Sequence, residues 1–366
     1  MNGPSYPAAR AVAERIQTRL ATNNVAFKDP GDAPKPDAVV IEEVISAAFW
    51  ASLRREEGKP PKISLAFVPP EQAGRPLMFA KRLRLAPEVL TRLAPAVEGP
   101  GVHIGVWWYG DHLCIWGTTH NVPTWCFVLE VVAPGLLVVK YRRPEPLTKF
   151  ANVAVLEGAS IKFLKPQDPV ISEQSSVLSS LLAFYASAGH QESDNILVRV
   201  AISMRNHGRG GTLLVVPRDS ESWKDSVGHP IPYLVTPASP ATADLADEPE
   251  ATRSVANALG GPTAVDGATV INDHLELLAF GVKIVQRDGR PRVERVLVTE
   301  PVEGSVEEVV VPSQLGNTRH LSAAQFVNDQ REAIALVASQ DGRFTVFAWS
   351  AARQIVHAHR LEALLL

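Results

Sequence analysis

The chain has 366 residues, of which 46% are hydrophobic and 20% are charged. This composition excludes wholesale disorder, and the length predicts about two domains. The formal net charge of -3 provides no clustered positive surface for the phosphate backbone of DNA or RNA. A nucleic-acid polymer is therefore not expected as a partner.

Two cysteines occur, Cys114 and Cys126, each inside an apolar strand-like run. Two such thiols do not indicate a disulfide framework, and they suit a reducing compartment. The N-terminus lacks the basic-then-apolar pattern of a signal peptide, and no apolar run approaches the roughly 20 residues needed to cross a bilayer. These patterns predict a cytoplasmic protein without a membrane partner.

Two amphipathic helices are expected at the start of the chain, over 6–21 and 39–55, where apolar residues recur every three or four positions. From residue 63 onward, short β-like runs alternate with turn residues. The runs cover 63–68, 102–109, 113–116, 125–132 and 136–141. Residues 1–165 are therefore predicted to form an α+β domain with an antiparallel sheet.

Proline residues at 165–172 mark the predicted domain boundary. Beyond it, helical and strand-like runs interleave. Helices are expected over 177–185, 196–206, 251–259 and 323–329, and strands over 212–216, 268–271, 275–285, 333–338 and 344–349. This order predicts an α/β sandwich on a mixed sheet over 173–366, with a mobile loop at 236–250.

Asp266-Gly267-Ala268 precedes an apolar run, which places a carboxylate at the mouth of a predicted strand. An aspartate in this position could bind a divalent cation or accept a hydroxyl proton, and the glycine would let a ligand approach the backbone. The alternative is structural, since Asp-Gly is also the commonest turn dipeptide.

The run from Gly316 to His320, Gly-Asn-Thr-Arg-His, comes immediately before a predicted helix. Backbone N–H groups at a helix start, together with an Arg, a His and a hydroxyl, form a sensible cradle for phosphate oxygens. The alternative is a helix cap with two solvated polar side chains. The glycine-rich run 208–211 is not interpreted as a phosphate-binding loop, because it precedes a strand and not a helix.

Together, in this order, the two motifs resemble the diadenylate cyclase (DAC) domain family, which includes the DNA-integrity-scanning cyclases. In that family an Asp-Gly-Ala opens one strand, and a Gly-Thr-Arg-His-Arg run begins a helix that is followed by an apolar strand and a Ser-Glu turn. The run 210–216 is also similar to an early strand of the family, and 333–338 is similar to the later one. The resemblance covers about residues 175–360.

The resemblance implies condensation of two ATP molecules into cyclic di-AMP with release of two pyrophosphates. Asp266 would hold Mg²⁺ or Mn²⁺ beside the attacking ribose hydroxyl, and the Thr318, Arg319 and His320 side chains would hold the triphosphate. Gly267 and Ala268 would leave room for the nucleotide. Because two nucleotides attack one another, a homodimer or higher homo-oligomer with facing active sites is also implied.

Three positions of the implied nucleotide-binding set depart from the family pattern. Asn317 replaces a glycine, Leu321 replaces the second arginine, and Gln340 follows Ser339 where a glutamate is frequent. Losing the arginine removes a charge-assisted phosphate contact, which predicts slow or absent turnover. Asp341 is adjacent and could supply the missing carboxylate as a second metal ligand.

In the first half of the chain, aromatic, histidine and cysteine side chains gather on the β-like runs. They are Trp107, Trp108, Trp116, Trp125, His103, His112, His120, Cys114 and Cys126. Core packing, an aromatic ligand pocket and a zinc site are the alternatives, and the spacing matches no closed metal site. The half as a whole is similar to the sensor domains called DACNV that precede some bacterial cyclases, which implies a signal input.

Three functional hypotheses follow: an active cyclase regulated by the first domain, a catalytically silent ATP-binding sensor, and a structural partner-binding protein. The joint presence of Asp266, Arg319 and His320 favours the enzyme. A silent descendant has no need to keep the metal-binding carboxylate together with the phosphate-binding pair.

Overall fold

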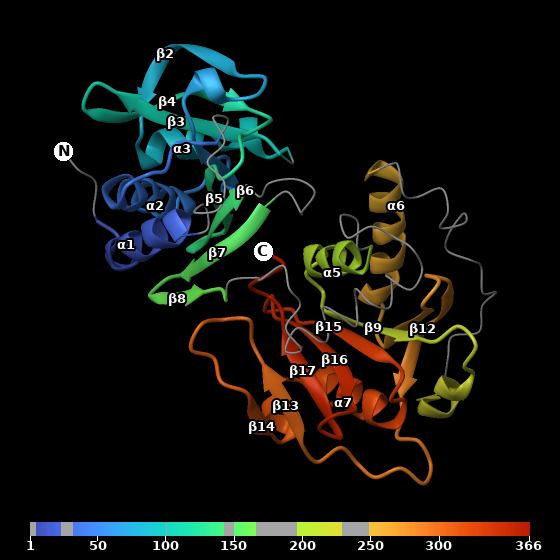
Figure 1. Ribbon diagram of the computed structural model, residues 1–366. Coiled ribbons are helices and arrows are strands. Elements are labelled where there is room, and N and C mark those ends of the chain that lie inside the picture. Colours follow the sequence, from blue (N-terminus) through green and yellow to red (C-terminus); the bar gives the residue numbers. More distant parts are fainter. Residues whose placement is uncertain (1–4, 23–31, 100, 143–149, 166–195, 229–248) are drawn as a thin grey trace. The chain divides into compact units, whose positions relative to one another are not determined.

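The computed structural model describes residues 5–22, 32–99, 101–142, 150–165, 196–228 and 249–366. The chain divides into two compact units, Met1–Pro166 with Leu366, and Gln167–Leu365. Each unit is a mixed sheet with helices packed on it (Figure 1), so the predicted α/β class is confirmed. Most of the predicted linker, the helix expected at 177–185 and most of the loop expected at 236–250 lie outside the described residues.

The first unit is built on an eight-stranded sheet in the order β2-β4-β3-β1-β5-β6-β7-β8. The strands are β1 (Ile63–Phe67), β2 (Leu77–Arg84), β3 (His103–Tyr109), β4 (His112–Thr119), β5 (Phe127–Ala133), β6 (Leu136–Arg142), β7 (Phe150–Glu157) and β8 (Ser160–Phe163). Its helices are α1 (Pro7–Thr22), α2 (Ala38–Ser52) and α3 (Pro87–Leu93).

The sheet of the first unit is mixed, because β1 runs parallel to β3 while its other neighbour, β5, is antiparallel. The expectation of an antiparallel sheet is therefore wrong at the β1–β3 pair. The chain between these two strands contains β2 and α3. This long crossover returns the chain beside β1 in the same direction, which a tight turn does not allow.

The two faces of this sheet carry separate cores. The three helices cover one face, where α2 and α3 contribute buried residues such as Ile41 and Leu90. On the other face Trp116 is the largest buried side chain of a smaller core, and its indole N–H donates to the carbonyl of Val68 at 2.9 Å. Gly105 lies beneath this ring, because a Cβ there would stand 2.1 Å from Trp116 Cε2.

The second unit is built on a nine-stranded sheet in the order β10-β12-β11-β9-β15-β16-β17-β13-β14. The strands are β9 (Gly211–Val216), β10 (Val227–Gly228), β11 (Ala268–Asn272), β12 (Leu277–Ile284), β13 (Val296–Thr299), β14 (Glu308–Val310), β15 (Ile334–Ala338), β16 (Phe344–Ser350) and β17 (Ile355–Arg360). Its described helices are α5 (Ile196–Asn206), α6 (Pro249–Gly260) and α7 (Thr318–Asp329).

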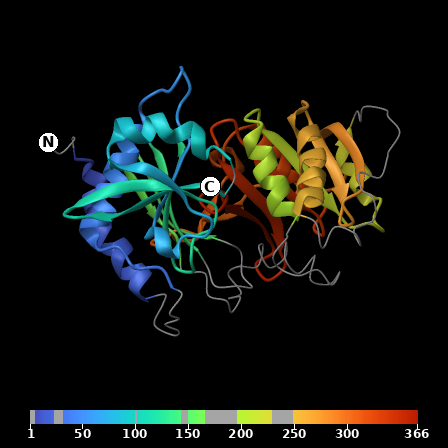
Figure 2. The same cartoon turned by 90° about the horizontal axis from the view of Figure 1, so that it is seen from above.

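Helices cover both faces of the second sheet, as the predicted sandwich requires. α5 and α6 lie side by side over one face (Figures 1 and 2), where they bury Leu213 and Val215 of β9. α7 covers the other face and buries Leu214 and Val216 of the same strand. This alternation follows from the two-residue period of a strand. Among the described residues, no helix combines the length and apolar character needed to span a membrane.

The register of β9 sets the geometry of one edge of this sheet. Gly211 at the start of β9 pairs with Ala338 at the end of antiparallel β15, and Thr212 pairs with Ala268 at the start of parallel β11. Neighbouring strands lie about 4.8 Å apart, so residues just beyond the ends of three adjacent strands fall within roughly 10 Å of one another. We call this edge the β9 edge.

Replacing Gly105 by Ala is expected to lower the stability of the first unit, because the new methyl group must displace the buried Trp116 ring. Overpacking of this kind costs about 1–3 kcal/mol. Thermal denaturation measures the loss. Gly99→Ala is the matched control, since a Cβ at this exposed glycine meets only Val102 Cγ2 at 3.5 Å. Equal melting temperatures for the two variants would contradict the packing argument.

Candidate functional site

The Asp266-Gly267-Ala268 motif lies at the β9 edge, directly before and at the start of β11. Asp266 is exposed, whereas Ala268 is 2% exposed and belongs to the core under α7. Gly267 has a φ of 108°, and a Cβ there would stand 2.6 Å from the carbonyl carbon of Gly281 in β12. In this structure the glycine lets two strands approach closely, and only the aspartate presents its side chain to solvent.

Asn317 caps the first turn of α7 and organises the residues around it. Its Oδ1 accepts the backbone N–H of Arg319 at 3.2 Å and lies 3.0 Å from Nδ1 of His320. Its Nδ2 donates to Ser339 Oγ at 3.5 Å. An amide oxygen only accepts, so Nδ1 of His320 carries the proton and Nε2 carries a lone pair. The helix-cap alternative is thus the geometry observed for Asn317.

His320 is buried, unlike the solvated phosphate contact expected from the sequence. The side chain is 2% exposed, meets Phe347 edge-on, and its Nε2 is buried without a hydrogen-bond partner. Its pKa is lowered to about 4, mainly by burial and also by nearby arginines such as Arg343 and Arg319, while the Asp341 carboxylate opposes the shift. The ring is therefore neutral near pH 7. It positions Asn317 and does not offer a cation to phosphate.

Arg319 reaches the loop before β9. A Cβ atom built on Gly210 would stand 3.3 Å from Nη1 of Arg319 and 3.4 Å from Cγ of Gln340, so both side chains lie against this glycine. Gln340 also donates through Nε2 to the carbonyl of Arg209 at 3.2 Å. Gly210 has a φ of 70°, which favours glycine at this close approach. The start of α7, the end of β15 and the loop before β9 therefore meet at the β9 edge.

Arg209 is the residue that the sequence analysis missed. The glycine-rich loop that carries it precedes a strand and so does not match a phosphate-binding loop, yet Gln340 holds that loop beside Arg319. Within the part of the chain that the structure describes, neither the Arg209 nor the Arg319 guanidinium has a carboxylate partner. Arginine side chains without carboxylate partners, carried by two segments that meet at one edge, are suited to binding an anion there. In the sequence, the feature that could have indicated this residue is an arginine with a glycine on each side, Gly208-Arg209-Gly210.

Of the other residues predicted to bind nucleotide or metal, Thr318 and Leu321 are exposed, and Asp341 already has an ion-pair partner. Thr318 is exposed in the first turn of α7, and Leu321 is 43% exposed where the resemblance expects an arginine. Asp341 pairs with Arg343 at 3.4 Å and accepts its backbone N–H. Asp341 is therefore engaged within its own turn.

A metal ion at the β9 edge would have few protein ligands. Among the described residues, no three His, Cys, Asp or Glu side chains group closely enough to hold a metal. Mg²⁺ is often bound through one or two carboxylates together with water and substrate phosphates. Asp266, as a single exposed carboxylate, fits that kind of site and does not fit a closed protein cage.

The aromatic and thiol cluster of the first unit is distributed over both faces of its sheet. Trp116 and Cys126 belong to the smaller core, and burial raises the pKa of the Cys126 thiol. His103 is 3% exposed, bonds Ser64 Oγ through Nδ1 at 2.7 Å, and has its pKa lowered to about 4, mainly by burial. These contacts favour core packing for the residues at the centre of the sheet, while Trp108 is 38% exposed.

The buried imidazole of His320 predicts a pH dependence of stability. Its folded pKa of about 4 lies below the usual value near 6.5, so the unfolded chain binds the proton first. The free energy of unfolding should fall as pH drops from about 6.5 to 4, by up to about 1.4 kcal/mol per pH unit from this group. The stability is fully present above that window.

Urea unfolding at pH 7 and pH 5 tests this dependence in wild type and in His320→Asn, which keeps a polar group but does not titrate. The variant should lose less stability between the two pH values than wild type. Equal losses would show that His320 is not the buried neutral group seen here.

Comparison with known families identifies one region. Residues 31–120 match the family described as "Probable sensor domain DACNV". No diadenylate cyclase domain is detected, and no curated protein matches the sequence of the chain. The matched region includes α2, α3 and the strands β1 to β4. The first unit therefore contains a region similar to the DACNV family of probable sensor domains.

Proposed function

We propose that the second unit binds ATP at the β9 edge and condenses two ATP molecules into cyclic di-AMP, under the control of the sensor domain. The observation that supports this most is that the Arg319 guanidinium lies against the Arg209-Gly210 loop before β9, while Asp266 lies just before the start of the neighbouring strand β11. Polyphosphate recognition requires clustered cations, and activation of the attacking hydroxyl requires a general base or a carboxylate-bound metal ion beside them.

In this proposal Arg209 and Arg319 bind the triphosphate from two sides and offset charge that builds during transfer. Backbone N–H groups in the first turn of α7, next to Thr318, contribute the positive end of the helix dipole. Gln340 supports Arg209 through the backbone carbonyl of its loop. Arg209 thus supplies the second guanidinium that the resemblance places at Leu321.

Asp266 would hold Mg²⁺ or Mn²⁺, which supplies Lewis-acid activation of the ribose 3′-hydroxyl when bound. The carboxylate is exposed and accessible for that role. His320 acts indirectly, because its Nδ1–H orients the Asn317 cap from which Arg319 is positioned. Each product joins two nucleotides head to tail, so the proposal also requires two copies of the chain with facing β9 edges.

A silent ATP-binding sensor is the second candidate, and specific observations favour it. Leu321 is exposed at the position of an expected arginine, and Asp341 is paired with Arg343. Gln340 has no carboxylate to offer a metal, and the second unit matches no cyclase family. Both candidates share the same ATP site and differ only in turnover.

Incubation of the full chain with ATP and Mn²⁺ or Mg²⁺, followed by mass spectrometry, tests the proposal. Wild type should yield cyclic di-AMP, and Asp266→Asn should yield none while still binding ATP. Arg209→Gln and Arg319→Gln should each weaken ATP binding by about tenfold or more, because each removes a charge-assisted phosphate contact. Arg295→Gln, at an exposed arginine of the same unit, is the matched control.

The outcomes separate the three hypotheses. Binding without product in wild type supports the silent sensor. No binding of ATP by wild type rejects both nucleotide functions and leaves the partner-binding protein.

A further inference from the structure

A cavity of about 200 Å³ opens at the end of the second sheet opposite the β9 edge. It lies beyond the last residue of β9, Val216, and the C-terminal end of α7, and it is lined by Trp223, Gln330 and three arginines among others. The volume corresponds to roughly six or seven water molecules. A ligand filling it would be a small molecule or a single functional group.

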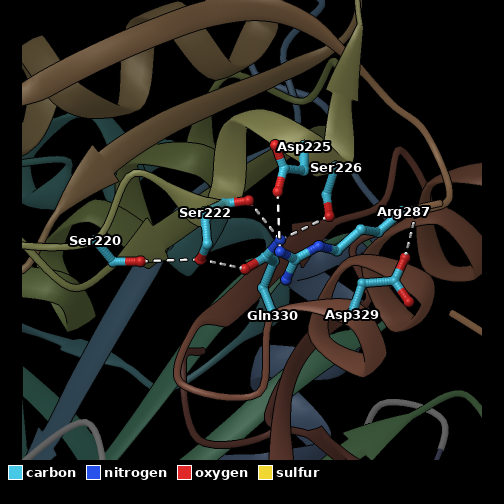
Figure 3. Close-up of polar contacts among 7 residues, drawn as sticks. All are labelled: Ser220, Ser222, Asp225, Ser226, Arg287, Asp329 and Gln330. Carbon is cyan, nitrogen blue, oxygen red and sulfur yellow. Dashed lines mark hydrogen bonds and ion pairs between the residues drawn. The ribbon is translucent and has the colours of Figure 1, made fainter. Parts of the chain in front are cut away.

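Ser220, Ser222 and Gln330 of the cavity lining belong to one network of hydrogen bonds (Figure 3). The Gln330 amide donates to Ser222 O and Ser226 Oγ at 2.8 Å each, and its oxygen accepts Ser222 Oγ–H at 2.7 Å. Ser220 Oγ lies 2.9 Å from Ser222 Oγ and must be the donor, since the Ser222 proton is already used. Gln330 is 6% exposed, so this network is formed before any ligand arrives.

The Asp329 carboxylate, which also lines the cavity, has hydrogen-bond partners for both of its oxygens. Asp329 is 2% exposed, and its Oδ2 accepts the backbone N–H of Arg287 at 2.9 Å. Its Oδ1 accepts Gln325 Nε2 at 2.9 Å. Asp329 therefore holds the backbone of Arg287 to the end of α7, and the Arg287 side chain is free to pair with a different carboxylate, that of Asp225.

Three arginines line the cavity beside two carboxylates, Asp329 and Glu332, and among the described residues only one of these arginines forms an ion pair. Arg287 pairs with Asp225 at 2.9 Å (Figure 3), and a turn closed by Arg290 N–H to Arg287 O at 3.1 Å places Arg290 beside it. Arg331 lies over the Trp349 ring with its guanidinium carbon 3.9 Å from the ring centroid. Among the described residues, neither Arg290 nor Arg331 has a carboxylate partner.

We propose that this cavity binds a phosphate group, either as inorganic phosphate or as a small phosphate monoester. Two unpaired guanidiniums match the double negative charge of phosphate better than the single charge of a carboxylate. Trp223 and Val216 provide an apolar wall against which a short carbon chain would pack. Two carboxylates also line the cavity. Glu332 is exposed, so solvent screens its repulsion of an anion. The oxygens of Asp329 accept hydrogen bonds from the Arg287 backbone and Gln325, which offset part of its charge.

Isothermal titration of the full chain with inorganic phosphate, and separately with glycerol 3-phosphate, tests this site. Wild type should bind at least one of the two, and Arg290→Gln/Arg331→Gln should bind it at least about tenfold more weakly. Both substituted residues are exposed, so the variant should fold. Arg292→Gln is the matched control, an exposed arginine of the same segment that does not line the cavity.

Arg319→Gln separates this site from the β9 edge, and it should leave phosphate binding at the cavity intact. The tryptophan indole signals of wild type provide a second readout, because Trp223 and Trp349 should shift when phosphate is added. Tighter binding of glycerol 3-phosphate would assign a monoester, and equal binding would assign phosphate itself. Absence of binding, unchanged binding by the double variant, or loss of binding in Arg319→Gln alone would each overturn the proposal.

Discussion

The register of β9 between two neighbours of opposite direction is the constraint on which the proposed nucleotide site depends. Leu214 and Val216 point into the core under α7, while Leu213 and Val215 point into the core under α5 and α6. A slip of one residue would exchange these sets between two differently shaped cores. Burial on both faces therefore fixes the strand ends, and the strand ends fix where Gly211 and the loop before it lie.

The position of Arg319 follows from the packing of α7. Phe326 and Val327 are fully buried and hold the helix on the sheet, while Asn317 caps its exposed first turn. His320 holds that cap through Nδ1, but its Nε2 is buried without a hydrogen-bond partner. A buried polar atom without a partner lowers the stability of the fold.

Much of the fold could be predicted from periodicity, and the failures have physical causes. The strands expected over 212–216 and 268–271 are confirmed as β9 and β11, whose bounds in the structure are 211–216 and 268–272. β17 was missed because His357 and His359 alternate with small apolar residues, and only the structure shows both imidazoles sharing Thr299 Oγ1 at 3.0 Å. The parallel β1–β3 pair was missed because short runs and turns carry no information on strand direction.

The placement of Asp266 and Arg319 along one edge depends on the order of the strands in the sheet. The sequence suggested that order only through a family resemblance.

A crystal structure of the chain with a non-hydrolysable ATP analogue and Mn²⁺ tests the central claim most directly. The account predicts the triphosphate between the Arg209 and Arg319 guanidiniums, with the metal on the Asp266 carboxylate. A nucleotide bound elsewhere on the chain, with the β9 edge empty, would contradict it.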